Sequence, residues 1–321
     1  MRNQPSMYPT SENSPAANER VWTYFDAYKN EGRILAIARP QLMTFHHVSE
    51  ETRQKDIELV KKKMSKPFLR EQRLTGPDAF AFENFLLSEC MRHHVLGGEI
   101  SPTTTYDDWV SGVDAVVEWP GYLDGPVRLA IDFTSTEEGA TITKKSDKLE
   151  NNISVKYLRS LVETEQGEQK ELRASMPLVL LGFDKEIFRL IAEKGELITA
   201  THPVRALLLE QASSQIDMQL SLHIQNACTS SRVTRDRKLK FVHEEFLLLG
   251  QDASVYQLVD FILEFDEGIR ARIFNEKDNK RLQDLLHIKT ALMRERTDNV
   301  IMDDEWKEAA QKSKTHQILS H

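Results

Sequence analysis

Residues 111–135 have the sequence SGVDAVVEWPGYLDGPVRLAIDFTS, which predicts two neighbouring β-strands. The first, residues 113–119, is rich in β-branched and aromatic side chains and ends at Pro120-Gly121. The second, residues 127–135, has one apolar face, because successive strand side chains point to opposite faces. That face consists of Val127, Leu129, Ile131 and Phe133. A turn around Asp124-Gly125 would join the two strands as a hairpin.

The segments on either side extend this pair into an α/β core. Pro77 suits the first turn of a helix that runs to about His94. A short edge strand is expected at residues 103–106. After the second strand, residues 143–163 have the apolar spacing of a helix, and residues 177–183 are typical of a buried strand. The predicted order is helix, short strand, strand, strand, helix, strand.

The rest of the chain is expected to be mostly helical. Residues 1–20 are polar and predict a disordered tail, and residues 21–74 predict a charged helical region. Residues 75–184 hold the α/β core, and residues 185–321 are helical, with a clear helix beginning at His202-Pro203. The last dozen or so residues are expected to be loosely ordered. We therefore predict an α/β fold with a mixed central sheet flanked by helices, and helical additions at both ends.

Composition argues against several classes of protein. The 321 residues are 40% hydrophobic and 29% charged, which is ordinary for a globular protein. The formal net charge of −8 argues against nucleic-acid binding through overall charge, but not against local basic surfaces. The longest apolar run, Met176 to Phe183, is too short to span a bilayer, and residues 1–20 lack a signal peptide's apolar stretch. Cys90 and Cys228 are expected to be buried free thiols in a cytoplasmic protein.

Three acids occupy positions that predict a metal site. Asp132 ends an apolar strand, where burial without a partner is unfavourable. Asp114 opens the preceding strand and would lie near Asp132 in a hairpin, so a divalent cation would relieve the repulsion between their carboxylates. Glu83 lies on an apolar helix face, with Phe80, Leu87, Cys90 and Met91 as neighbours at helical spacing. Each acid alone fits an ordinary turn or solvated role, and the joint placement favours a functional one.

These residues resemble the motifs of the PD-(D/E)XK nuclease superfamily. Its core has the order helix, three strands, helix, strand, and the resemblance covers about residues 77–184. The segments that match are Phe82-Glu83-Asn84-Phe85, Gly112-Val113-Asp114 and Ile131-Asp132-Phe133-Thr134. The resemblance implies a restriction-endonuclease-like core in which Glu83, Asp114 and Asp132 hold Mg²⁺ or Mn²⁺, together with the backbone carbonyl of Phe133.

The lysine of the superfamily motif is missing from its usual place. Thr134 occupies the position two residues after Asp132. Some members carry this lysine on the following helix, where Lys145 shares the inward stripe of Leu149 and Ile153. We therefore predict that Lys145 is the catalytic lysine, with Lys148 as the second candidate. The alternative is that these lysines belong to a solvated first turn of the helix.

Other polar groups have simpler interpretations. His93 and His94 diverge on the helix surface and are expected to be helix-end histidines. Asp107 and Asp108 could lie near the acids, but turn chemistry is the preferred interpretation. Residues 303–305 are most simply the acidic start of a helix. Two basic stretches could contact phosphate: Lys61, Lys62, Lys63, Lys66, Arg70 and Arg73, and the predicted loop with Arg232, Arg235, Arg237, Lys238 and Lys240.

The function that these observations predict is Mg²⁺-dependent hydrolysis of phosphodiester bonds in nucleic acid, with DNA as the expected substrate. Asp114, Asp132 and Lys145 would be the catalytic residues. One alternative is a catalytically inactive protein of the same fold that binds nucleic acid or a protein partner. A third possibility is a mostly helical interaction protein in which the three acids lie apart.

Overall fold

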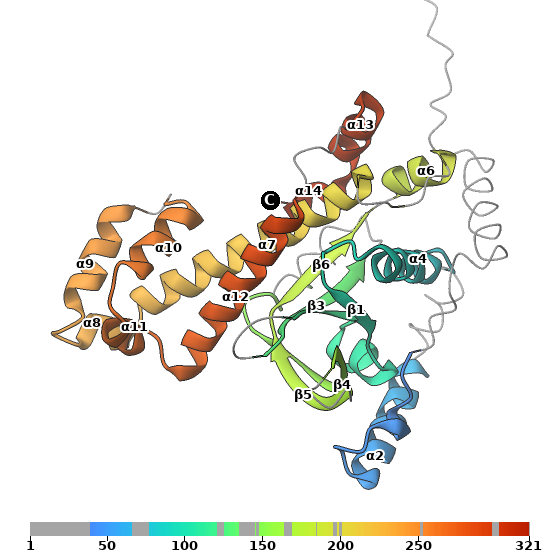
Figure 1. Ribbon diagram of the computed structural model, residues 1–321, viewed down its shortest axis with the longest axis horizontal. Coiled ribbons are helices and arrows are strands. Elements are labelled where there is room, and N and C mark those ends of the chain that lie inside the picture. The colour runs from blue at the N-terminus through green and yellow to red at the C-terminus, as the bar shows by residue number, and fades with distance from the viewer. Residues whose placement is uncertain are drawn as a thin grey trace, which may run out of the picture.

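The computed structural model of the protein is shown in Figure 1. It describes residues 39–65, 77–120, 125–134, 145, 148–163, 169–183, 185–194, 198, 201–250, 253–296 and 302–320. The predicted disordered tail, residues 1–20, lies outside the described residues, as do Lys66, Arg70 and Arg73 of the first basic stretch.

The central sheet has four strands in the order β1-β2-β3-β6. The strands are β1 (Glu99–Pro102), β2 (Ala115–Trp119), β3 (Val127–Thr134) and β6 (Leu178–Gly182). Neighbours pair antiparallel from β1 to β3, and β6 then pairs parallel with β3. The sheet is therefore mixed, as the sequence predicts, and the three longest of its predicted strands are confirmed.

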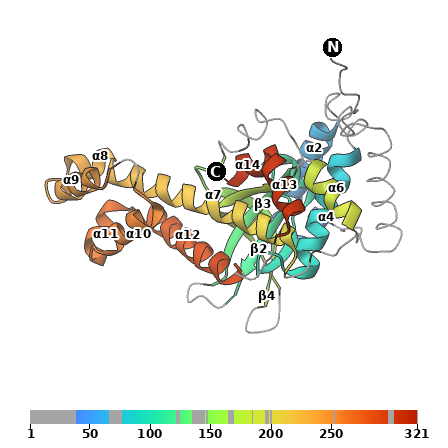
Figure 2. The same cartoon turned by 90° about the horizontal axis from the view of Figure 1, so that it is seen from above.

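Helices lie on both sides of the sheet in the chain. Ahead of it come the short 3₁₀-helix η2 (Leu42–Thr44), α2 (Glu50–Met64) and α4 (Pro77–His93), and a π-helix η3 (Asp107–Ser111) lies between β1 and β2. After β6 come α6 (Lys185–Lys194), α7 (Pro203–Cys228), α8 (Ser231–Arg235), α9 (Lys240–Leu249), α10 (Val255–Leu263), α11 (Glu267–Ile273), α12 (Glu276–Glu295), α13 (Asp304–Lys312) and α14 (Lys314–Ser320). Helices α8 to α11 are grouped at the far end of α7, away from the strands (Figures 1 and 2).

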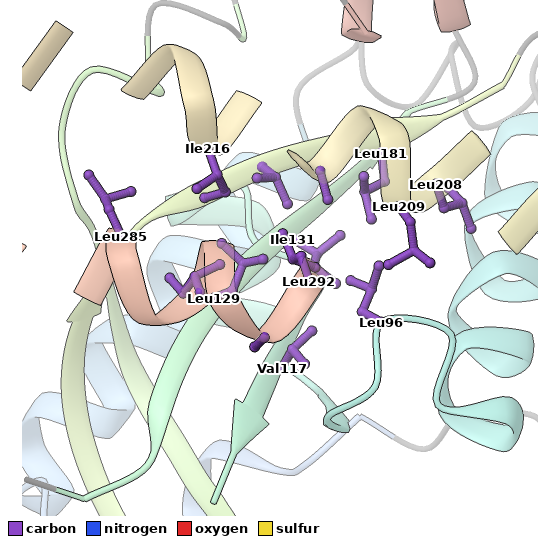
Figure 3. Packing of buried hydrophobic residues seen from close by; sticks show 14 of the residues in the cluster. Leu96, Val117, Leu129, Ile131, Leu181, Leu208, Leu209, Ile216, Leu285 and Leu292 are labelled. Carbon is purple, nitrogen blue, oxygen red and sulfur yellow. The ribbon is translucent and has the colours of Figure 1, made fainter. Parts of the chain in front are cut away.

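The two faces of the sheet pack against different layers. Leu129 and Ile131 of β3 belong to the core shared with α4, α7 and α12, and Figure 3 shows α7 and α12 lying over this face. Ala130, on the opposite face, packs with Leu158 and Met176 of a separate hairpin, β4 (Ile153–Glu163) with β5 (Gln169–Met176). The alternation along β3 thus separates two layers. The helical C-terminal region shares the core of the sheet rather than folding apart from it.

The predicted helix at residues 143–163 is wrong over most of its described length. Residue 145 is helical and residues 148–150 form a turn, but residues 153–163 are strand β4. The apolar side chains at 149, 153, 158 and 161 match a helical period by coincidence. Val155 and Tyr157 are buried on either side of the half-buried Lys156, which is the period of a strand, and the register shift after Val155 lets Leu158 be buried as well. Pairing with β5 decides the outcome.

Three other predictions need correction. The edge strand is β1, four residues before the expected 103–106, because the Thr104 side chain accepts a hydrogen bond from the amide of Asp107, the first residue of η3. Within the predicted helical region 21–74, residues 45–49 are not helical. The basic segment 232–240 is a loop only over residues 236–239, since α8 and α9 take up its ends.

The C-terminal segment is ordered, contrary to prediction. Helix α14 packs against α7 and β6, and Leu319 is 3% exposed. The Ser214 hydroxyl donates a hydrogen bond to the carbonyl of Ser320 at 2.7 Å. The polar composition of this segment suggested that it is exposed to solvent. His316 and Thr315 are instead buried, and both have interaction partners within the protein.

Candidate functional site: an acidic cluster at the end of β2 and β3

Asp114 and Asp132 lie opposite each other at one end of the sheet. The β2–β3 register ends at the pair Ala115 and Ile131, and the charge of Asp114 contributes to raising the pKa of Asp132, so the two carboxylates lie near each other just beyond that pair. The Asp114 amide donates to the Ile131 carbonyl at 2.8 Å, and the Phe133 amide donates to Asp114 Oδ2 at 2.8 Å. Each aspartate is 5% exposed. The strand pairing therefore buries two carboxylates side by side.

Lys145 enters this site. Its Nζ lies 2.7 Å from Asp132 Oδ1. Burial alone would lower the pKa of Lys145, but the charge of Asp132 outweighs it and the pKa is raised, so the amine stays protonated. Burial raises the pKa of Asp132 to about 6, with Lys145 opposing that rise. Thr134, in the usual lysine position, is buried in β3 beside β6.

Lys148 lies next to the same carboxylate. A side-chain carbon added to Gly112 would lie 2.7 Å from Lys148 Nζ and 3.7 Å from Asp132 Oδ2. Lys145 makes the direct ion pair with Asp132, and the charge of Lys148 also lowers the pKa of Asp132. The two lysines that the sequence singled out therefore both reach the site, although the helical stripe used to select Lys145 does not extend to Ile153.

Glu83 of α4 faces the same cluster. Burial raises its pKa well above the ordinary value, and the negative charge of Asp114 adds to the rise while Lys145 opposes it. Asp108 and Asp132 raise it further. These contributions mean that Glu83 lies within electrostatic range of Asp114, Asp132 and Lys145.

Two further residues join the site that sequence reasoning did not assign to it. Asp108 lies in η3, and Arg39 Nη2 lies 3.3 Å from Asp108 Oδ2 and 3.3 Å from Asp114 Oδ1. Burial raises the pKa of Asp108 to about 7, with Arg39 opposing the rise. The Asp107-Asp108 pair offered a signal that was interpreted as turn chemistry. No sequence pattern indicated Arg39, because it is 75 residues from Asp114 in the chain. We call Glu83, Asp108, Asp114 and Asp132 the acidic cluster.

The π-helix η3 fixes Asp108 in place. Asp107 is fully buried and accepts hydrogen bonds from the backbone amides of Lys156 at 2.7 Å and Tyr157 at 3.1 Å. The hydroxyl of Thr104 donates to the same carboxylate. Asp107 thus ties η3 to β4 as a structural anchor, while its neighbour Asp108 points into the cluster. Single-turn π-helices occur frequently at functional sites.

Gly112 ends η3 in the left-handed conformation, with φ 71° and ψ 51°. The Gly112→Ala variant should lower the free energy of unfolding by about 1–2 kcal/mol, because a β-carbon disfavours this backbone region. The added methyl group would also displace Lys148 Nζ. Urea denaturation provides the measurement.

Gly112→Asn separates the effect of backbone strain from the effect of displacing Lys148, because asparagine tolerates the left-handed region better than alanine. We expect Asn to be less destabilising than Ala, while both displace Lys148. Equal stability of wild type and Gly112→Ala would contradict the assigned backbone strain.

The donors of the acidic cluster suit a hard divalent cation. All are carboxylate oxygens, and four acids face the positive charges of Arg39, Lys145 and Lys148. Within the described ranges, no three His, Cys, Asp or Glu side chains form a ready-made metal site. Mg²⁺ is commonly held by one or two carboxylates and completes its shell with water. Asp114 and Asp132 fit that requirement.

The remaining polar candidates have structural roles. His93 Nε2 lies 3.7 Å from the buried Glu89, one turn earlier on α4. Asp303 caps α13 by accepting from the Trp306 amide, which confirms the acidic helix start. Cys90 and Cys228 are buried free thiols, as predicted.

The first basic stretch lies beside the site. Lys63, in the last turn of α2, donates to the backbone carbonyl of Trp109 in η3 at 2.9 Å. Lys61 and Lys62 are exposed on the same turn. In the part of the chain that the structure describes, no helix has the length and apolar character needed to cross a membrane. Comparison with protein-family models, with curated proteins and with solved structures gives no match for this chain.

Proposed function

We propose that this protein hydrolyses phosphodiester bonds of nucleic acid, with DNA as its substrate, in a reaction that requires Mg²⁺ or Mn²⁺. The single observation that carries the proposal is the contact between Lys145 and Asp132, opposite Asp114. Lys145 comes from a segment outside β3 and would replace the motif lysine, whose usual position in β3 holds Thr134. The order α4, β1, β2, β3 and the parallel β3–β6 pair support a restriction-endonuclease-like core, whereas the β4–β5 hairpin stands where the family pattern has a helix before the last strand.

The proposed roles follow from the positions of the side chains. Asp114 and Asp132 would hold the cation, with Glu83 as a further carboxylate. When bound, Mg²⁺ supplies Lewis-acid stabilisation of phosphate charge and makes a bound water more acidic. Lys145 keeps its proton, so its amine can orient the attacking water or donate to a phosphate oxygen. The Phe133 amide keeps Asp114 in its orientation toward β3.

Local positive charge can overcome the net charge of −8. Lys61 and Lys62 are exposed at the end of α2, and Lys63 connects that turn to η3 next to Asp108. Lys148 adds a cation beside Gly112. Phosphate groups that flank the cleaved bond could bind this basic margin, because such contacts act over about 10 Å at 0.1 M salt.

The proposal is tested by incubating the purified protein with supercoiled plasmid and with single-stranded DNA. We expect nicking or degradation in Mg²⁺ and in Mn²⁺, and none in excess chelator. A folded protein that binds Mn²⁺ and DNA but cleaves neither substrate would move the function to the non-catalytic alternative. One observation favours that second candidate: Arg39 and Lys145 already neutralise Asp114 and Asp132 without a metal.

Replacing Lys145 with Ala should slow cleavage by about a hundredfold, since a preorganised donor to developing charge typically contributes that much. The affinity for Mn²⁺ should change much less, because the amine is not a metal ligand. Single-turnover cleavage and calorimetric Mn²⁺ titration measure the two quantities. Lys194→Ala is the matched control, since Lys194 pairs with Asp303 and Glu305 outside the acidic cluster. An equal loss in both variants would contradict the role of Lys145.

A further inference from the structure

Arg39 makes the widest set of contacts with the acidic cluster. Its Nη2 atom bridges Asp108 Oδ2 and Asp114 Oδ1, at 3.3 Å each. Its Nη1 atom donates to Thr103 at the carbonyl, 3.4 Å, and at the hydroxyl, 3.3 Å, and to the Asp114 carbonyl at 3.5 Å. The planar fork of the guanidinium therefore spans two carboxylates that come from different parts of the chain.

The oxygen that Arg39 contacts on Asp114 is the one that remains available to a cation. Asp114 Oδ2 accepts the Phe133 amide at 2.8 Å, which leaves Oδ1 on the side of Arg39. A divalent ion bound through Asp114 Oδ1 would stand next to a guanidinium of the same sign. Like charges at such range repel strongly in a partly buried site, so both cations cannot keep full contact with this oxygen.

The contact lengths indicate which cation of the chain can leave. Ion-paired N–H···O hydrogen bonds are usually 2.7–2.9 Å long. The Lys145–Asp132 contact, at 2.7 Å, is within that range, whereas the contacts of Arg39 are 3.3–3.5 Å. Arg39 thus makes the longer contacts of the two, and the contact lengths alone distinguish them, because both side chains are partly exposed, at 20% for Arg39 and 28% for Lys145.

We infer that Arg39 is a built-in competitor of the divalent cation: it neutralises Asp108 and Asp114 in the metal-free protein and leaves them when the ion binds. The inference rests on the proposed function, because it concerns the same acidic cluster. It deepens that function by naming a residue that sets the metal concentration at which the site fills. The coupling is reciprocal, so strengthening the Arg39 contacts would weaken metal binding by the same factor.

The test is Mn²⁺ binding without DNA, measured by calorimetry on wild type and Arg39→Gln. Glutamine keeps hydrogen-bonding capacity and removes the charge. We expect Arg39→Gln to bind Mn²⁺ at least about fivefold more tightly. In chelator it should melt at a lower temperature than wild type, and Mn²⁺ should raise its melting temperature by more. Arg159→Gln is the matched control, since Arg159 pairs with Glu171 away from the cluster, and its Mn²⁺ affinity should equal that of wild type.

Arg39→Lys provides a second test in case the Arg39→Gln variant does not fold. A lysine ammonium cannot bridge two carboxylates as the guanidinium fork does, so its Mn²⁺ affinity should fall between those of wild type and Arg39→Gln. Unchanged or weaker Mn²⁺ binding in the folded variants, with metal-dependent cleavage retained in wild type, would overturn the inference alone. Absence of Mn²⁺ binding in wild type and in every variant would overturn the proposed metal site and this inference together.

Discussion

The Asp132→Asn variant is expected to lose Mg²⁺-dependent DNA cleavage by at least about a hundredfold while remaining folded. Mutation of groups that only support a metal ligand typically lowers metal affinity or activity by about 10–100-fold, so loss of a direct ligand should have a larger effect. Asparagine keeps the shape of the side chain but not the charge that the cation requires. Burial is the main cause that raises the pKa of Asp132, so a neutral asparagine avoids the burial of that charge, although Lys145 loses its ion-pair partner.

Asp56→Asn is the matched control for this experiment. Asp56 is also a buried aspartate that pairs with a lysine, Lys156, but it lies on α2 outside the acidic cluster. Its cleavage rate should stay within about twofold of wild type if the rate depends on the cluster rather than on buried ion pairs in general. Thermal melting of both variants verifies folding. Equal cleavage by wild type and Asp132→Asn would trace the activity to a contaminating nuclease.

The strands that decide the fold could be predicted because burial and local pattern agree in them. The alternating residues 127–134 became β3, and the apolar residues 178–182 became β6. Helices α4 and α7 began at Pro77 and Pro203, where proline is favoured because the first helical amide needs no partner. In each case one interpretation satisfied both the hydrophobic pattern and the boundary residues.

The predictions failed where a distant partner decides the structure. Residues 153–163 fit a helical period locally, but pairing with β5 makes them a strand. Helix α14 is polar in sequence, and only its contacts with α7 and β6 show why it is ordered. Propensity cannot anticipate such pairing, because the free energy comes from residues far away in the chain.

The residues of the site also divide into those that could be predicted from sequence and those that could not. Asp114 and Asp132 could be paired from sequence, because a hairpin fixes which residues face each other. Glu83 was selected from its place on an apolar helix face, and Lys145 from the superfamily resemblance, which supplied the expectation of a displaced lysine. Arg39 could not be found, since it arrives from a segment whose path no local pattern describes. Whether these residues hold a metal is still a prediction.

Gln215→Leu should lower the free energy of unfolding by about 3 kcal/mol or more, because β6 is an edge strand whose free backbone groups are paired by glutamines. Gln215 Oε1 accepts the Leu180 amide at 2.7 Å, and its Nε2 donates to the Leu180 carbonyl at 2.7 Å. Gln211 makes the same pair of bonds with Gly182, and Gln219 donates to the carbonyl of Leu178. Four residues of helix rise about 6.0 Å and two of strand about 6.6 Å, so the spacings match.

Leucine fits the volume at position 215 but leaves the amide and the carbonyl of Leu180 without their partner. Each buried group left unpaired costs about 1–3 kcal/mol, which gives the expected loss. Gln219→Leu is a graded control, because Gln219 donates a single bond to this strand edge and should lose about half as much. Urea unfolding of the three proteins measures the differences. If Gln215→Leu proved as stable as wild type, the edge of β6 would have to be protected by something other than the glutamines of α7, and the match between helix and strand spacing would be incidental.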